Sequence, residues 1–171
     1  MAVKKLNIVI LAAGKGTRMY SSTPKVPYLD ADANTLILLG DVPLVSIESC
    51  QQLISKTGEL GLLTVNKQNP TGYGRIVRDA SNVIQAIVEH RDANEAQRQI
   101  TEVNTGMMVV NNTHLKNWLG QLNNKNAQGE YYLTDIVAMA VKQGLTVASE
   151  MTSDEASVEG VNSKPDLAIL E

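Results

Sequence analysis

The stretch Leu6-Asn7-Ile8-Val9-Ile10-Leu11-Ala12-Ala13 decides the fold class, because it is a nearly continuous apolar run that stops at Gly14. Such runs are typical of a strand buried on both faces of a parallel sheet. A second run, residues 35–39, stops at Gly40-Asp41. Parallel strands end at the same edge of a sheet, and ligands of open α/β sheets bind at that edge. The sequence therefore predicts a ligand site where these two strands end.

The rest of the chain alternates between strand-like and helix-like patterns without an internal repeat. Ser46 and Thr113 are placed to cap helices, and Gly58 and Gly144 to end them. This order of elements predicts an α/β fold with a Rossmann-like, mostly parallel sheet and an antiparallel flank. The other expected strands are 60–65 and 145–148 in the parallel core, and 75–78, 83–89 and 103–110 in the antiparallel flank. The expected helices carry residues 50–54, 115–122 and 133–141.

Composition and charge fit a single globular domain over residues 1–171. Hydrophobic residues make up 43% of the chain and charged residues 19%, which is enough to build a core without a disulfide or a structural metal. A formal charge of −3 and the absence of a basic run disfavour nucleic-acid binding. The apolar run at the start is too short for a membrane span or a signal peptide, and the single cysteine cannot form an internal disulfide. We expect a cytoplasmic protein without membrane association.

One interval does not fit a parallel sheet. Only residues 28–34 connect the polar loop after the first strand to the second strand, and they show no amphipathic pattern. Parallel neighbours need a crossover of about a dozen residues or more, which is usually helical. The sequence indicates that a segment is missing between Val26 and Pro27, so that the predicted fold is incomplete there.

The loop Leu11-Ala12-Ala13-Gly14-Lys15-Gly16-Thr17-Arg18-Met19 is rich in glycine and follows a strand, where backbone N–H groups can approach a phosphate. It is neither the dinucleotide fingerprint, which needs a third glycine where Met19 stands, nor the P-loop. Arg18 and Lys25 add two cations, which suits a triphosphate. The alternative, a strand-to-helix turn with charged residues facing solvent, is about as frequent for a glycine loop alone.

Six segments, in order, resemble the N-terminal uridylyltransferase domain of the bacterial bifunctional enzyme that makes UDP-N-acetylglucosamine. The first, the glycine loop with Pro24-Lys25-Val26, is similar to the signature of sugar-nucleotide pyrophosphorylases. That family carries a uracil-reading Gln-x-x-Gln-Leu-Gly-Thr motif between its Pro-Lys-Val and Gly-Asp elements, and an acetyltransferase half after the domain. Neither has a counterpart in this chain. The other five segments are Gly40 to Leu44, Asn69 to Ile76, Glu102 to Gly106, Gln128 to Asp135 and Val158 to Asn162.

The resemblance implies a nucleotidyltransferase that converts UTP and N-acetylglucosamine 1-phosphate to UDP-N-acetylglucosamine and pyrophosphate, for peptidoglycan and lipopolysaccharide synthesis. It implies Mg²⁺ as cofactor, bound by Asp41 and Asn162, because this ion takes few protein oxygens beside phosphates and waters. It also implies that Arg18 and Lys25 are catalytic residues on the triphosphate. The implied substrate-binding residues are Leu11, Ala12, Ala13, Gly14 and Asn162 with Gly74, Glu89, Asn104 and Thr134, the last four on the sugar side.

Several alternatives stay open at this point. Asp41 taken alone is about twice as often a turn residue as a metal ligand, and Glu89 fits an ordinary strand end. His90 is expected to be a solvated surface residue and Cys50 a small core residue. The family forms trimers through the absent half, so we expect a monomer or a weak oligomer. The chain could also be a non-catalytic fragment that keeps the sugar-side surface, or a related pyrophosphorylase of other specificity.

Overall fold

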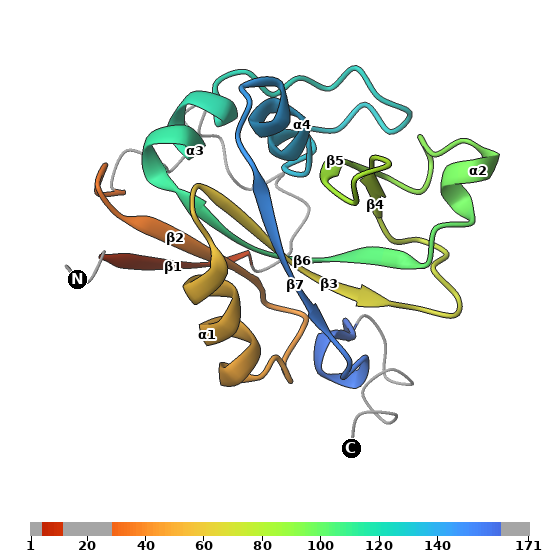
Figure 1. The fold of residues 1–171 in the computed structure, drawn as a ribbon, viewed down its shortest axis with the longest axis horizontal. Coiled ribbons are helices and arrows are strands. Elements are labelled where there is room, and N and C mark those ends of the chain that lie inside the picture. Colours follow the sequence, from red (N-terminus) through yellow and green to blue (C-terminus); the bar gives the residue numbers. More distant parts are fainter. Residues whose placement is uncertain (1–4, 12–28, 162–171) are drawn as a thin grey trace.

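The computed structural model describes residues 5–11 and 29–161, and in this part of the chain a central sheet carries helices on both faces (Figure 1). Its strands are β1 (Leu6–Leu11), β2 (Asn34–Leu39), β3 (Leu60–Asn66), β6 (Glu102–Asn111) and β7 (Val147–Thr152). They lie in the order β1-β2-β6-β3-β7. β1 is parallel to β2 and β3 is parallel to β7, while β6 opposes both β2 and β3. The expected α/β fold with a mostly parallel sheet is confirmed.

The antiparallel flank consists of a hairpin made by β4 (Arg75–Arg78) and β5 (Ile84–Val88). Both strands lie where the sequence predicted them, to within a residue or two. The flank differs in one respect, because β6 does not lie in it but between β2 and β3 in the sheet. Its apolar run buries Met107 and Val109 on one face and Met108 and Val110 on the other. Such a run predicts burial, but it says nothing of the neighbouring strands or their direction.

The helices are α1 (Ile47–Lys56), α2 (Glu95–Arg98), α3 (Asn112–Leu119) and α4 (Asp135–Lys142), followed by the 3₁₀ helix η2 (Ala156–Val158). Ser46 caps α1 as predicted, since its Oγ accepts a hydrogen bond of 3.0 Å from the Ser49 N–H. The prediction that Thr113 caps α3 is wrong. Asn111 is the cap, and its Oδ1 accepts from the Thr113 N–H at 3.0 Å. No described helix is long and apolar enough to span a membrane.

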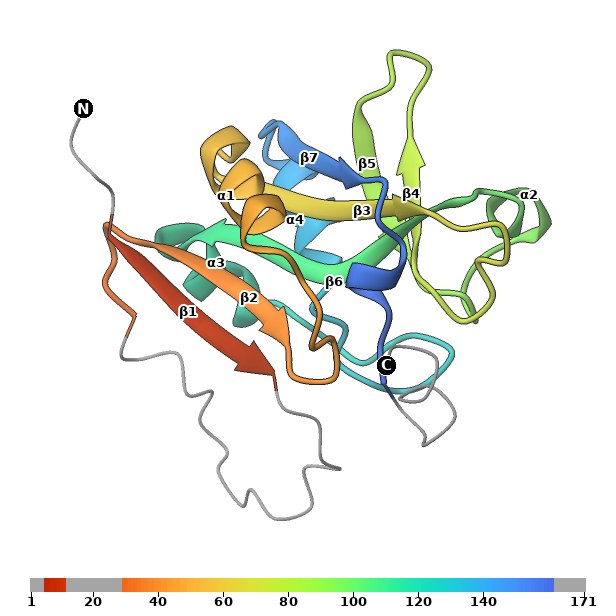
Figure 2. The same cartoon turned by 90° about the horizontal axis from the view of Figure 1, so that it is seen from below.

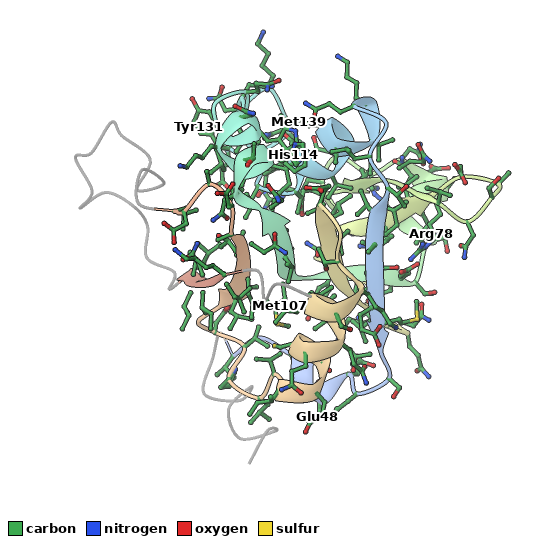
Figure 3. All side chains as sticks on the ribbon, turned by 60° about the vertical axis from the view of Figure 1, so that its left-hand side comes forward. Glu48, Arg78, Met107, His114, Tyr131 and Met139 are labelled. Atoms are coloured by element: carbon green, nitrogen blue, oxygen red, sulfur yellow. The ribbon has the colours of Figure 1, made fainter. Side chains whose placement is uncertain are left out.

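Two hydrophobic clusters pack on opposite faces of the sheet. One lies under α3 and α4 and contains the fully buried Trp118, whose Nε1 donates to Gln143 Oε1 at 3.2 Å. The other lies under α1 and contains Leu53 and Met107. Figure 3 labels Met107 on the α1 side of the sheet. Cys50 is half-buried against this second cluster, as expected of a core residue, and burial raises the pKa of its thiol.

β1 forms one edge of the sheet (Figure 2). Most of its apolar side chains are exposed. The exposed fractions of Ile8 and Ile10 are 60% and 61%, which contradicts the prediction of a strand buried on both faces. Leu6, Ile8 and Ile10 alternate along the strand and therefore share one face. The Val26/Pro27 junction lies outside the described residues.

We expect this edge strand to cause weak self-association, because among the described residues it pairs only with β2, and an edge strand with exposed apolar side chains is a template for pairing. Ile8→Lys should shift the protein toward monomer in sedimentation velocity runs at increasing concentration. Val83→Lys, which places a charge at an exposed valine on the hairpin, is the matched control. It should leave the proportions of monomer and oligomer unchanged. Identical distributions for Ile8→Lys and the unmodified chain would contradict the role of β1.

Candidate functional site

The first two strands end at one common edge, as the sequence predicted. Leu11 of β1 is paired in register with Leu39 of β2, and the Gly40 N–H donates to the Leu11 carbonyl at 3.1 Å. Asp41 follows directly and is half-buried. Ala12, Ala13, Gly14, Arg18 and Lys25, which were predicted to continue this edge, lie outside the described residues.

A cleft of about 330 Å³ opens beside this edge. Four of the predicted substrate-binding residues line it, and they come from β1, from the end of β5, from β6 and from the start of α4. The rest of the lining consists of β2 and β6 side chains and of one loop before α4, whose exposed Tyr131 is labelled in Figure 3. The predicted residues in the lining are Leu11, Glu89, Asn104 and Thr134.

The four residues predicted for the sugar are brought together by the hairpin and β6. Thr134 Oγ1 donates a hydrogen bond of 2.8 Å to Glu89 Oε1. The Asn104 N–H donates to the Gly74 carbonyl at 2.9 Å. A Cβ at position 74 would lie 2.8 Å from Ile87 Cγ2 and 3.4 Å from both Glu89 carboxylate oxygens. Glycine at this position therefore leaves the Glu89 carboxylate uncrowded.

Asn104 lines the cleft and carries a buried side-chain oxygen that is unpartnered among the described residues. Its side chain is 9% exposed, and its Oδ1 has no hydrogen-bond partner among the described residues. Leaving a buried acceptor unpaired costs roughly 1–3 kcal/mol. The Glu89 carboxylate and the polar side chains of the loop before α4 line the same cleft, so the site is suited to a polar ligand.

Gly106 is a site residue to which the sequence analysis gave no role. Its φ is +83°, and a Cβ there would lie 2.4 Å from Leu39 Cδ1. The register between β3 and β6 shifts nearby, between Leu62 and Thr64. A glycine inside a strand is the usual sign of such an irregularity or of a close approach, so this signal was available in the sequence.

Asp92 is a second residue that the sequence analysis missed, and it holds the loop before α4. Its Oδ1 accepts from the Ala127 N–H at 2.9 Å, and its Oδ2 accepts from the Tyr132 hydroxyl at 3.2 Å. Gln128 Nε2 donates to the same hydroxyl at 2.9 Å. Gln128 and Tyr132 line the cleft, so this carboxylate shapes one wall of it. No local sequence pattern around Asp92 predicts its contacts with Ala127 and Tyr132.

His90 is not the solvated residue that was expected. It is half-buried, and its Nδ1 lies 3.3 Å from Nη2 of Arg75. Arg75 is only 1% exposed and also donates to the Tyr73 carbonyl. Burial, together with the charge of Arg98, lowers the pKa of this guanidinium. The contact between Arg75 and His90 supports the hairpin next to Gly74 and Glu89.

Of the two predicted metal ligands, Asp41 is the one within the described residues. No group of three or more His, Cys, Asp or Glu side chains in residues 5–11 and 29–161 could hold a metal ion. One carboxylate at a strand end is what an ion that keeps waters and phosphates needs. The Val161 N–H donates to the Asp41 carbonyl at 2.7 Å. The second predicted ligand, Asn162, lies outside the described residues but follows Val161 directly in the sequence.

No protein-family model matches the chain. Comparison with known proteins nevertheless finds close relatives in sequence. The bifunctional protein GlmU of Methylobacillus flagellatus is 47% identical over 231 residues, which cover 98% of this chain and 50% of that protein. GlmU of Pseudomonas fluorescens is 50% identical over 173 residues, and GlmU of Pseudomonas aeruginosa PAO1 is 51% identical over 173 residues. Both matches cover 100% of this chain and 38% of the relative.

One solved structure shares the fold. It is a Bacillus anthracis protein named as a glucose-1-phosphate thymidylyltransferase, in complex with sucrose. The TM-score is 0.52 at 18% sequence identity, and the match covers 70% of this chain and 46% of that one. This likeness concerns the fold alone. The chain spans half or less of the length of the GlmU relatives, and with about 50% identity over its whole length it belongs to the GlmU family as the counterpart of one part of those proteins.

Proposed function

We propose that this chain is the uridylyltransferase part of a GlmU protein, which joins UTP to N-acetylglucosamine 1-phosphate and releases pyrophosphate. The observation that carries the proposal is the polar cleft at the carboxyl edge of β1 and β2, with Glu89 and Asn104 in its lining. The bifunctional GlmU relatives support it, and so does the fold shared with a sugar-phosphate nucleotidyltransferase. The product is a cell-envelope precursor, and we place the reaction in the cytoplasm.

On the sugar side, each polar group has a distinct task. Glu89 can accept hydrogen bonds from sugar hydroxyls, and its bond from Thr134 fixes one of its two oxygens. Asn104 lines the cleft, and its side-chain amide is proposed to bond the sugar; its Oδ1, which has no partner among the described residues, is buried and becomes available when the side chain turns toward the ligand. The carbonyl of Gly74 is already engaged by the Asn104 N–H, so these two residues position each other.

On the nucleotide side, the chemistry is mainly positioning and charge neutralisation. An oxygen of the sugar phosphate attacks the α-phosphorus of UTP in line, the bond to the β-phosphate breaks, and pyrophosphate leaves. Leu11, Ala12, Ala13 and Gly14 are proposed to hold the nucleotide, while Arg18 and Lys25 stabilise the departing charge. Asp41 and Asn162 are proposed to hold Mg²⁺, which when bound neutralises phosphate oxygens.

The chain is also proposed to lack a segment between Val26 and Pro27. The exposed apolar face of β1 supports this, because strands of this kind are normally covered. The 231-residue match with the M. flagellatus protein supports it as well, whereas the Pseudomonas matches span 173 residues for the 171 of this chain and contain no long insertion. The M. flagellatus relative therefore contains positions within the aligned span that have no counterpart here.

The metal assignment is tested by Asp41→Asn. We expect this change to lower pyrophosphate release from UTP and N-acetylglucosamine 1-phosphate by about 100-fold or more at saturating Mg²⁺, because an amide attracts the cation far less than a carboxylate does. Asp32→Asn, at an exposed aspartate, is the control and should keep full activity. Activity of Asp41→Asn within a few fold of the unmodified chain would refute the assignment. Absence of release from the unmodified chain would identify it as the non-catalytic fragment.

Sugar selectivity tests the role of Asn104. Glucose 1-phosphate should be used with a kcat/KM about 10-fold lower or worse than N-acetylglucosamine 1-phosphate, because it leaves a buried polar group unpaired. Asn104→Ala should reduce the difference between the kcat/KM values of the two sugar phosphates. Asn117→Ala, at an exposed position on α3, should leave this difference unchanged. Equal kcat/KM values for the two sugar phosphates with the unmodified chain would show that the cleft does not read the acetamido group.

The junction is tested by peptide mapping of the protein from its natural source. Cleavage after Tyr20 and Tyr28 would yield the peptide 21–28, which spans Val26 and Pro27, only if the two residues are directly joined. We expect this peptide to be absent and the intact mass to exceed 18.5 kDa. Detection of the peptide in a well-folded monomer of 18.5 kDa would show that the deletion is real.

A further inference from the structure

Residues 153–161, which follow β7, form a strap that crosses from the end of that strand to the loop of Asp41. Its first turn is fixed locally, because Asp154 accepts from the Ser157 N–H at 3.2 Å and its carbonyl accepts from the Ser157 hydroxyl at 2.8 Å. Val158 is 4% exposed and packs in the cluster under α1. The far end of the strap is joined to Asp41 by the Val161 N–H.

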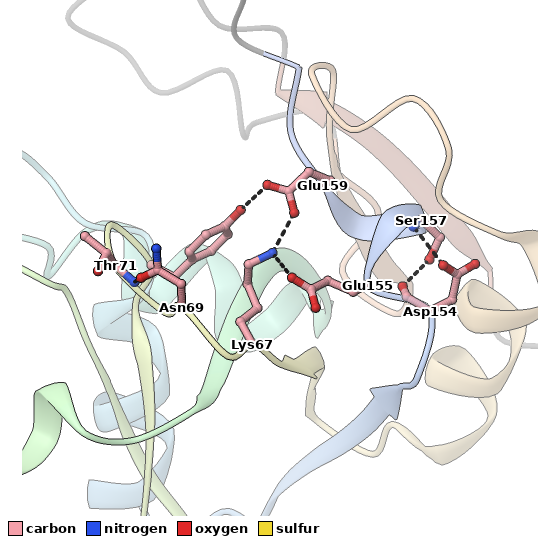
Figure 4. A network of polar contacts seen from close by, with 8 residues as sticks. Lys67, Asn69, Thr71, Asp154, Glu155, Ser157 and Glu159 are labelled. Atoms are coloured by element: carbon pink, nitrogen blue, oxygen red, sulfur yellow. Dashed lines mark hydrogen bonds and ion pairs between the residues drawn. The ribbon is translucent and has the colours of Figure 1, made fainter. Parts of the chain in front are cut away.

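Lys67, which follows β3, binds this strap with two ion pairs (Figure 4). Its Nζ lies 2.6 Å from Glu155 Oε1 and 2.6 Å from Glu159 Oε2. The Lys67 side chain is 8% exposed, so water screens these pairs much less than it screens ion pairs at the surface. The Tyr73 hydroxyl donates to Glu159 Oε1 at 2.8 Å, and the ammonium lies 5.0 Å from the centre of the Tyr73 ring.

The ammonium is what allows the two carboxylates to lie on the same side of the strap. Burial disfavours the charged form of Lys67, but its hydrogen bonds with Glu155 and Glu159 outweigh this, and the pKa of Lys67 is raised above its ordinary value. Without the Lys67 ammonium, the carboxylates of Glu155 and Glu159 would repel each other. Glu159 would still accept the hydrogen bond from the Tyr73 hydroxyl. Each group of this cluster is thus engaged within the chain, which marks the cluster as a structural clamp.

We propose that Lys67 is a positioning residue for the Asp41 site: by clamping Glu155 and Glu159 it holds the strap so that Val161 stays bonded to the carbonyl of Asp41. This inference rests on the proposed function, in which Asp41 and the residue after Val161, Asn162, share a cation. Supporting residues of this kind commonly change metal affinity 10- to 100-fold when they are replaced.

The test compares Lys67→Met with Lys56→Met in the full chain. Lys56 also pairs with a glutamate, Glu150, but its side chain is 56% exposed and lies on α1, so it is the matched control. Amide hydrogen exchange of residues 159–161 should become about tenfold faster in Lys67→Met and stay unchanged in Lys56→Met. Mn²⁺ affinity, measured by electron paramagnetic resonance without substrate, should fall about tenfold in Lys67→Met only.

Two further variants guard against loss of folding. Tyr73→Phe removes only the hydroxyl that reaches Glu159 and should accelerate the same amides by a smaller factor, and Lys67→Arg should restore most of the protection. Unchanged exchange in both Lys67→Met and Tyr73→Phe would overturn the clamp. Faster exchange with unchanged Mn²⁺ affinity would overturn the positioning role. If the unmodified chain does not bind Mn²⁺, the metal assignment of the proposed function fails, while the exchange rates still decide on the clamp.

Discussion

The pairing of β6 with β2 on one side and β3 on the other joins the two parallel pairs of strands into one sheet. β6 is buried on both faces, and it also pairs with β4 through Val103 and Arg75. The hairpin that carries Glu89 and the strand that carries Asn104 are therefore fixed to the same element. The cleft depends on this arrangement, since its walls come from both sides of β6.

The cleft and the Asp41 loop are stabilised in different ways. In the cleft, short hydrogen bonds between neighbouring side chains and backbone groups position Glu89 and Asn104, and one amide oxygen stays unpaired. At the Asp41 loop, the positioning comes from a distant part of the chain, through the strap and the Lys67 ion pairs. A sugar pocket needs selective hydrogen bonds, whereas a cation site needs oxygen atoms held at a fixed distance.

The exposed face of β1 has a different physical meaning from the cleft. Apolar residues at Leu6, Ile8 and Ile10 gain free energy only when something covers them, at about 25 cal/mol for each Å² removed from water. In the described residues, β2 supplies the hydrogen-bonding partner of β1 on one side. The same β1 that ends at the cleft therefore also carries an apolar surface.

The sequence by itself determined the class of fold, most strands and helices, and the edge where the site lies, because apolar runs and caps act over a few neighbouring residues. It also indicated, through a resemblance, which residues gather at the cleft: Leu11, Glu89, Asn104 and Thr134. Only the tertiary structure decided that β6 lies inside the sheet, that β1 is exposed, and that Asp92 and Lys67 support the site. These facts depend on contacts between residues up to 92 positions apart, and no local pattern records such contacts.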